Sequence, residues 1–108
     1  MANVRMTHPT ALILTALAGG YRYGFDIMDA TALPSGTVYP VLRRLEEARL
    51  VRSTWEARRE ADEDGRPRRR LYELTKAGRE AAVEAEARVS RLLAARRLLA
   101  PTPKGQRA

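Results

Sequence analysis

One apolar face is the clearest pattern in the sequence. Four apolar residues recur at steps of three and four positions, the spacing of side chains along one side of a helix. They are Val38, Val41, Leu42 and Leu45. The turn-forming residues 33–36 precede them, so we expect a helix that begins there. Ser35 or Thr37 is predicted to cap it, because hydroxyl oxygens accept hydrogen bonds from the first amides of a helix.

Two helices are predicted ahead of this one. Residues 8–18 are apolar on almost every side, which indicates an enclosed helix, and Thr7 or His8 can cap it. The Gly19-Gly20 pair is expected to end it, because glycine readily adopts left-handed dihedral angles. A shorter helix is predicted from about Gly24 to Ala30.

Two short strands follow the three helices. Residues 50–56 and residues 71–74 are rich in β-branched and aromatic side chains, and an acidic, glycine-containing turn separates them. Three helices followed by such a hairpin are typical of a winged helix-turn-helix. The fold class predicted for the chain is therefore mainly α with a small β-hairpin.

A long helix is predicted from Lys76 to about Leu99, with Thr75 as its cap. Because it is longer than a domain of this size can cover, we expect a two-fold homodimer that buries its apolar seam. A helix that folds back on its own core is the alternative. The predicted interface residues are Ala82, Ala85, Val89, Leu92, Leu93, Arg96 and Leu99.

These elements predict three parts of the chain. Residues 1–74 are expected to form the winged helix-turn-helix domain, and residues 75–99 the C-terminal dimerisation helix. Residues 100–108 lack the apolar content that folding requires, and we expect a disordered tail.

The charge of the chain points to nucleic acid. Twenty basic residues against thirteen acidic ones give a net charge of +7, and all but Lys76 and Lys104 of the basic residues are arginine. A GC-rich genome would also raise the arginine content, so clustering is better evidence than the total. Four arginines fall within residues 66–70, in the turn between the two strands, where they would repel one another unless phosphates lay nearby. We therefore interpret this turn as a DNA-binding wing.

The outer side of the helix over residues 35–47 has a matching composition. Gly36, Pro40 and Arg43 fall opposite its apolar stripe, and small residues permit the close approach that a helix in the major groove requires. Arginine side chains can reach guanine O6 and N7 there. An ordinary solvated helix face is the alternative.

Catalysis and metal binding find little support in the composition. The chain has no cysteine and a single histidine, His8, so nucleophilic triads and thiolate or multi-histidine metal sites have no residues to build on. Asp62, Glu63 and Asp64 are expected to shape the turn rather than to hold a cation. No stretch reaches the roughly 20 apolar residues of a membrane span. We expect a cytosolic protein without cofactor that is not an enzyme.

The residues carry a resemblance to a known family. Residues 35–46, 50–51, 65–68 and 72–78 together resemble the PadR family of bacterial transcriptional regulators, and residues 23–27 are similar to the start of that family's second helix. The resemblance spans residues 11–99. It rests mainly on the combination of two motifs, Tyr39-Pro40 in a predicted helix and Gly65-Arg66-Pro67 in the predicted wing.

The resemblance implies a homodimeric repressor of a palindromic operator in double-stranded DNA, in the subfamily with a single C-terminal dimerisation helix. It also implies a pocket near the dimer interface for a small hydrophobic or planar effector. Two departures bear on this: Arg49 stands where the family often has glycine, and the last helix has no aromatic side chain to line such a pocket. The expected DNA-binding residues are Tyr23, Ser35, Gly36, Thr37, Tyr39, Pro40, Arg43, Arg44, Arg66, Arg68 and Arg69.

Two other functions remain open on the sequence. A winged helix can serve as a protein-interaction module whose basic face binds an acidic protein. RNA binding ranks third, because the chain lacks a series of aromatic side chains that could stack on unpaired bases. The sequence specifies neither the operator nor the regulated genes.

Overall fold

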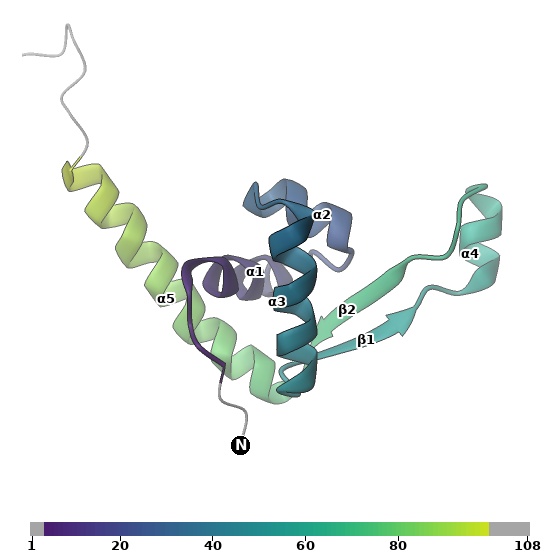
Figure 1. The fold of residues 1–108 in the computed structure, drawn as a ribbon, viewed down its shortest axis with the longest axis horizontal. Coiled ribbons are helices and arrows are strands. Elements are labelled where there is room, and N and C mark those ends of the chain that lie inside the picture. Colours follow the sequence, from purple (N-terminus) through teal and green to yellow (C-terminus); the bar gives the residue numbers. More distant parts are fainter. Residues whose placement is uncertain (1–3, 100–108) are drawn as a thin grey trace, which may run out of the picture.

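The computed structural model describes residues 4–99, and it has the predicted order of elements with one addition (Figure 1). The elements are α1 (His8–Ala18), α2 (Gly24–Thr31), α3 (Ser35–Glu47), β1 (Val51–Trp55), α4 (Arg58–Glu63), β2 (Arg70–Leu74) and α5 (Lys76–Leu99). The mainly α fold with a small antiparallel hairpin is confirmed. The predicted tail, residues 100–108, lies outside the described residues.

Helix α1 lies at the centre of the core and contacts α2, α3, α5 and β2. Its residues Ala11, Ile13 and Leu14 are fully buried, as its nearly all-apolar sequence predicts. Thr7 caps it by accepting a hydrogen bond from the amide of Thr10. The apolar stripe of α3 faces this core, and all four of its predicted residues are buried. The core therefore holds α3 with its opposite side exposed.

The start of α3 differs from the prediction. Neither Ser35 nor Thr37 provides the cap; the N-cap residue is Pro34, and no side chain caps the helix. The backbone carbonyl of Pro34 instead accepts hydrogen bonds from the amides of Thr37 and Val38 at 2.9 and 3.0 Å. The helix begins at Ser35, whose side chain remains exposed.

Helix α3 ends in a tight left-handed turn. Ala48 is the C-cap and Arg49 has φ +61°, so the position where the family often has glycine does adopt the strained conformation. Two interactions fix the turn: the amide of Leu50 donates to the carbonyl of Leu45 at 2.9 Å, and Thr75 Oγ1 donates to the carbonyl of Arg49 at 2.7 Å. The strain is thus tolerated because neighbouring residues over-determine the backbone.

Replacing Arg49 by glycine is expected to stabilise the fold by about 0.5–1 kcal/mol, since glycine removes the left-handed strain but adds entropy to the unfolded chain. Chemical denaturation of both proteins measures the difference. Arg49→Ala is the control: it also removes the exposed side chain but keeps the strain, so it should bring no gain. Equal stabilisation by alanine and glycine would show that the side chain, and not the backbone, is responsible.

The hairpin is confirmed, with β1 slightly shorter and β2 one residue longer than predicted, and it carries an extra helix. Strands β1 and β2 pair antiparallel in a register that places Val51 opposite Leu74 and Trp55 opposite Arg70. The predicted turn contains α4, which lies at the far end of the hairpin (Figure 1). The expectation of an arginine-rich tip is therefore wrong: residues 66–70 lie on the return path from α4 to β2. We call residues 51–74 the wing.

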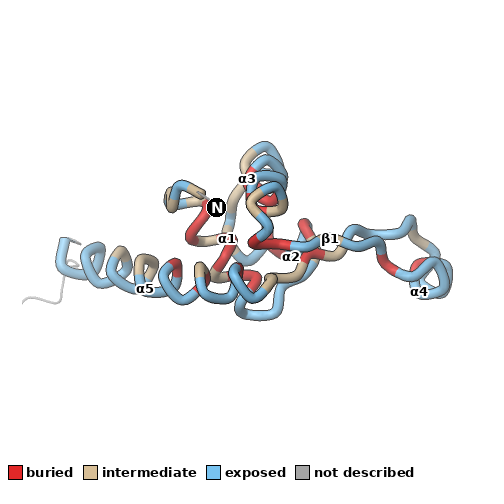
Figure 2. Tube along the Cα trace, turned by 90° about the horizontal axis from the view of Figure 1, so that it is seen from below, coloured by how far each residue is buried: buried red, intermediate tan, exposed pale blue. Residues whose placement is uncertain are grey.

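Helix α5 has the predicted bounds, and part of it packs on the core of its own subunit, the alternative that the sequence left open. Its N-terminal half packs on α1, and its C-terminal half projects past the core, where exposed residues predominate (Figures 1 and 2). Ala82 and Ala85 are 2% and 0% exposed within the subunit. Their assignment to the dimer interface is thus corrected: their small side chains let α1 pack closely, and neither is available to a second subunit.

Candidate nucleic-acid interface

The outer side of α3 is open to solvent. Every predicted contact residue of this helix is exposed except Thr37, which is half-buried. Among residues 4–99, Arg43 has no side-chain hydrogen bond or ion pair, and Arg44 makes one long hydrogen bond, at 3.4 Å, to the carbonyl of Pro40. We call this surface the recognition face. Its members are Ser35, Gly36, Tyr39, Pro40, Arg43 and Arg44.

The position of Tyr39 depends on a glycine in α2. A Cβ atom added to Gly24 would lie 2.5 Å from the Tyr39 hydroxyl oxygen and 2.7 Å from its ring, closer than real Cβ contacts. The absence of a side chain at residue 24 therefore lets Tyr39 pack against α2 while remaining 42% exposed. The Tyr-Gly-Phe sequence at the start of α2 thus has a steric reason.

The wing lies beside the recognition face. Tyr39 lines one hollow together with Tyr23 of the α2 cap and with Arg69 and Arg70 of the wing. The guanidinium of Arg69 lies 3.8 Å from the centre of the Tyr23 ring, within the range of a cation–π interaction. The recognition face and the arginines of the wing are therefore adjacent.

Glu46 of α3 fixes the base of the wing. The Ser53 hydroxyl donates a hydrogen bond to Glu46 Oε1 at 2.6 Å, and Arg70 donates to the same oxygen at 3.4 Å. Arg70 also donates to Ser53 Oγ at 2.8 Å, which closes a three-residue network between α3, β1 and β2. This network sets the angle at which the wing leaves the helix.

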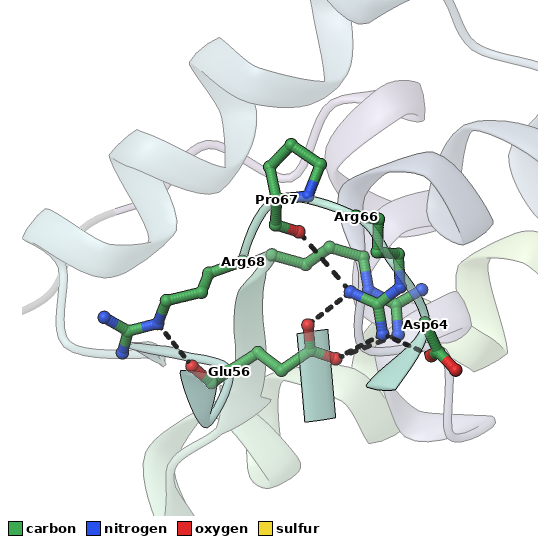
Figure 3. Close-up of polar contacts among 6 residues, drawn as sticks. Glu56, Asp64, Arg66, Pro67 and Arg68 are labelled. Atoms are coloured by element: carbon green, nitrogen blue, oxygen red, sulfur yellow. Dashed lines mark hydrogen bonds and ion pairs between the residues drawn. The ribbon is translucent and has the colours of Figure 1, made fainter. Parts of the chain in front are cut away.

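A buried carboxylate organises the arginines of the wing. Glu56 has a side chain only 2% exposed, and both of its oxygens accept hydrogen bonds from Arg66 (Figure 3). Arg69 donates to Oε2 at 3.0 Å, and Arg68 Nε donates to the backbone carbonyl of Glu56 at 2.8 Å. Hydrogen bonds from Arg66 and Arg69 lower the pKa of Glu56 to about 2 against the effect of burial. The carboxylate is therefore ionised at neutral pH.

The role of Glu56 was not predicted from the sequence, and the prediction gave Arg66, Arg68 and Arg69 equal roles. The structure separates them: the side chain of Arg66 is only 25% exposed and also contacts Asp64 at 3.0 Å, that of Arg69 is 42% exposed, and Arg68 is exposed. The strand register could have indicated that Glu56 lies among these arginines. Extended by one pair beyond Trp55 and Arg70, it places Glu56 opposite Arg69, whose carbonyl accepts the Glu56 amide at 2.7 Å.

The end of the wing is acidic rather than basic. Glu60, Asp62, Glu63 and Asp64 are all exposed on or just after α4. Arg59 is paired with Glu63 at 3.6 Å. Phosphates would be repelled by these carboxylates, so DNA contacts are expected at the arginines nearer α3.

A second surface feature lies between α1 and the projecting half of α5. An apolar groove runs there, with Leu92 half-buried and Leu93 60% exposed. We call it the α5 groove. The residues that line it are His8, Leu12, Val89, Leu92, Leu93, Ala95, Arg96 and Leu99.

Within residues 4–99, no group of three or more His, Cys, Asp or Glu side chains is arranged to hold a metal ion. None of the helices in that range combines the length and the apolar character needed to cross a membrane.

Three helices, a two-stranded wing and an exposed recognition face beside that wing define a winged helix-turn-helix protein. The particular family follows from comparison with known proteins. The model of the transcriptional regulator PadR-like family matches residues 13–84, well over half of the chain. The chain belongs to this family. No curated protein sequence matches it.

Solved structures share the fold. A PadR family transcription regulator from Clostridium difficile is 23% identical and covers 85% of this chain and 97% of its own, with a TM-score of 0.67. A PadR-like transcription factor from Bacteroides fragilis is 27% identical over 84% of this chain and 88% of its own, with a TM-score of 0.59.

A structure with DNA is also similar. Lactococcus lactis ZitR in complex with DNA is 22% identical and covers 90% of this chain, with a TM-score of 0.65. The present chain spans about three fifths of the ZitR chain, 62% of its length. At this identity, the likeness establishes the fold alone.

Proposed function

We propose that the protein is a homodimeric transcriptional repressor that binds a palindromic operator in double-stranded DNA. The observation that supports this best is the position of the exposed α3 surface next to the wing arginines, with Tyr39 and Arg69 lining one hollow. Helix α3 would lie in the major groove, and the wing would contact the backbone. Repression would follow from occlusion of the polymerase.

Within this proposal the contact residues divide by chemistry. Arg43, with no partner among residues 4–99, would read a guanine edge from the middle of α3. Thr37 and Tyr39 would donate to phosphates near the N-terminus of the helix, where the helix dipole also favours anions. Arg68 and Arg69 would contact phosphates from the wing.

The α5 groove supports the homodimer in this proposal. Leu93, Leu98 and Leu99 are 60%, 87% and 84% exposed on the projecting half of α5. A second copy of the same helix would cover these side chains around a two-fold axis. The interface would consist of Val89, Leu92, Leu93, Arg96 and Leu99 from the predicted set, with His8 and Leu12 of α1. A hydrophobic effector would have to bind the same groove and favour one spacing of the two α3 helices.

Binding to the operator is expected to distinguish the base-reading arginine of α3 from the phosphate-binding arginines of the wing. The operator can be obtained by selecting bound sequences from a random duplex library. Arg43→Ala is expected to weaken operator binding by about 1–3 kcal/mol and to relax selectivity at one base pair of each half-site. Arg68→Ala is expected to weaken binding to operator and scrambled duplexes alike and to lower the salt slope by about one unit.

Binding isotherms of both variants on both duplexes, at several salt concentrations, provide the measurement. Equal behaviour of the two variants would contradict the division of roles. A wild-type chain with almost no affinity for random duplex at low salt would instead favour the alternative function, a protein-interaction module that binds an acidic partner.

A further inference from the structure

We propose that Glu56 is the positioning residue of the wing: its buried carboxylate removes Arg66 from DNA binding and holds Arg69, with Arg68 on its backbone carbonyl, in place for phosphates. This inference rests on the proposed function and refines it. It assigns Arg66, one of the predicted contact residues, to the structure of the wing.

The geometry around Arg66 supports a structural role. Both terminal nitrogens of its guanidinium face carboxylates, with Glu56 accepting from both and Asp64 from Nη2 at 3.0 Å (Figure 3). A guanidinium has five N–H donors in a rigid fork, and a bidentate carboxylate pair occupies the edge that would otherwise bind a phosphate. Separating the pair would leave the buried carboxylate with a single nitrogen of Arg69 as its charged partner, which is more costly than the loss of a surface ion pair.

Arg68 and Arg69 are held differently. Arg69 gives only one nitrogen to Glu56, and its guanidinium carbon lies 3.8 Å from the centre of the Tyr23 ring. Arg68 gives only Nε to the Glu56 carbonyl, at 2.8 Å. Each side chain thus gives a single nitrogen to Glu56, and both residues are exposed. Fixing them before DNA arrives reduces the entropy lost on binding.

The carboxylates of the protein therefore engage the arginines of residues 66–70 unequally. Arg66 pairs with both oxygens of Glu56 and with Asp64, and Arg70 pairs with Glu46 and donates twice to Ser53. Arg69 gives one nitrogen to Glu56, and Arg68 makes no ion pair within residues 4–99, so these two keep the most donors for phosphates. Each phosphate contact contributes about 0.9 to the slope of log affinity against log salt. The number of arginines that act on DNA can thus be measured without knowledge of the operator.

The test uses the full chain, a random-sequence duplex and a salt titration from about 50 to 200 mM. In Glu56→Gln/Arg66→Gln both charges are lost and an amide pair can replace the ion pair, so the slope should equal that of the wild type. Arg68→Gln is the matched control and should lower the slope by about one unit. Glu56→Gln alone should release Arg66 and steepen the slope by about one unit, roughly a fourfold larger affinity change over this range.

Two results would overturn the proposal. If the salt slope of the double variant falls by about one unit, Arg66 contacts a phosphate in the wild type. If the salt slope of Glu56→Gln is unchanged or shallower, Glu56 does not keep Arg66 from phosphates. Circular dichroism and melting of each variant detect unfolding. Should the double variant unfold, the arginine Nε–H resonances of the wild type show by NMR whether Arg66 contacts DNA. Addition of duplex should shift the resonances of Arg68 and Arg69 and leave that of Arg66 unchanged.

Failure of the proposed function has a different signature. In that case the wild type itself would show no salt-dependent binding to any duplex, and the positioning role for DNA would fall with it. If the wild type binds and only the Glu56 variants behave otherwise than expected, the regulator assignment stands and the role of Glu56 alone is wrong.

Discussion

Gly78→Ala is expected to destabilise the fold by about 3 kcal/mol, the upper range for overpacking a closely packed site. A Cβ atom at residue 78 would overlap the backbone carbonyl oxygen of Leu50 and would lie 3.2 Å from Leu74 Cδ2. That carbonyl is fixed, because it accepts a hydrogen bond from the amide of Thr75 at 3.0 Å. The junction of the wing with α5 therefore has no flexible atom that could yield.

Thermal unfolding measures this effect, with an expected drop in Tm of more than about 10 °C. Gly36→Ala is the matched control, since Gly36 is also a helical glycine and a Cβ atom there would meet nothing within 4 Å. Because alanine has a higher helix propensity than glycine, the control should be at least as stable as the wild type. A Gly78→Ala protein as stable as Gly36→Ala would mean that α5 can shift away from Leu50.

Leu93→Glu is expected to convert the proposed dimer into a folded monomer and to lower operator affinity by at least about 100-fold. Leu93 is 60% exposed in the subunit and lines the α5 groove, so a carboxylate there costs little in the monomer but would be buried in the dimer. Linking two binding modules typically raises affinity by 10²–10⁴-fold, and a monomer loses that gain on a two-fold operator.

Sedimentation at micromolar concentration and operator binding give the two measurements. Val83→Glu is the matched control: Val83 is 70% exposed on the same helix, but it lines a separate hollow formed with α1 and β2. It should remain dimeric and bind the operator normally. A monomeric wild type, or equal dissociation by both variants, would refute the proposed interface.

Much of the fold was predictable because its signals are local. The stripe on α3 follows from residues three and four positions apart, and the Thr75 cap lies next to the helix that it begins, with Oγ1 accepting from the amide of Gly78 at 3.1 Å. The cap of α3 was not predictable in the same way. The Pro34 carbonyl supplies it, and any residue at position 34 carries such a carbonyl.

The surroundings of the site residues that the sequence did not predict have a common origin in contacts between distant positions. Ala85 suits a dimer seam by its spacing along α5, yet the structure buries it inside the subunit, where α5 packs on α1. Arg66 has the residue type of a phosphate ligand, yet Glu56, ten positions earlier in the chain, binds it. Composition indicates which groups can pair, and geometry decides which of them do.

The sequence by itself determined the order of helices and strands except α4, the apolar face of α3 and the membership in the PadR-like family, because periodicity, turn residues and motifs are read within a few positions. The tertiary structure alone decided which arginines stay exposed and which half of α5 is left uncovered. Burial and ion pairing depend on distances between elements far apart in the chain, and those distances exist only once the helices and the wing have packed.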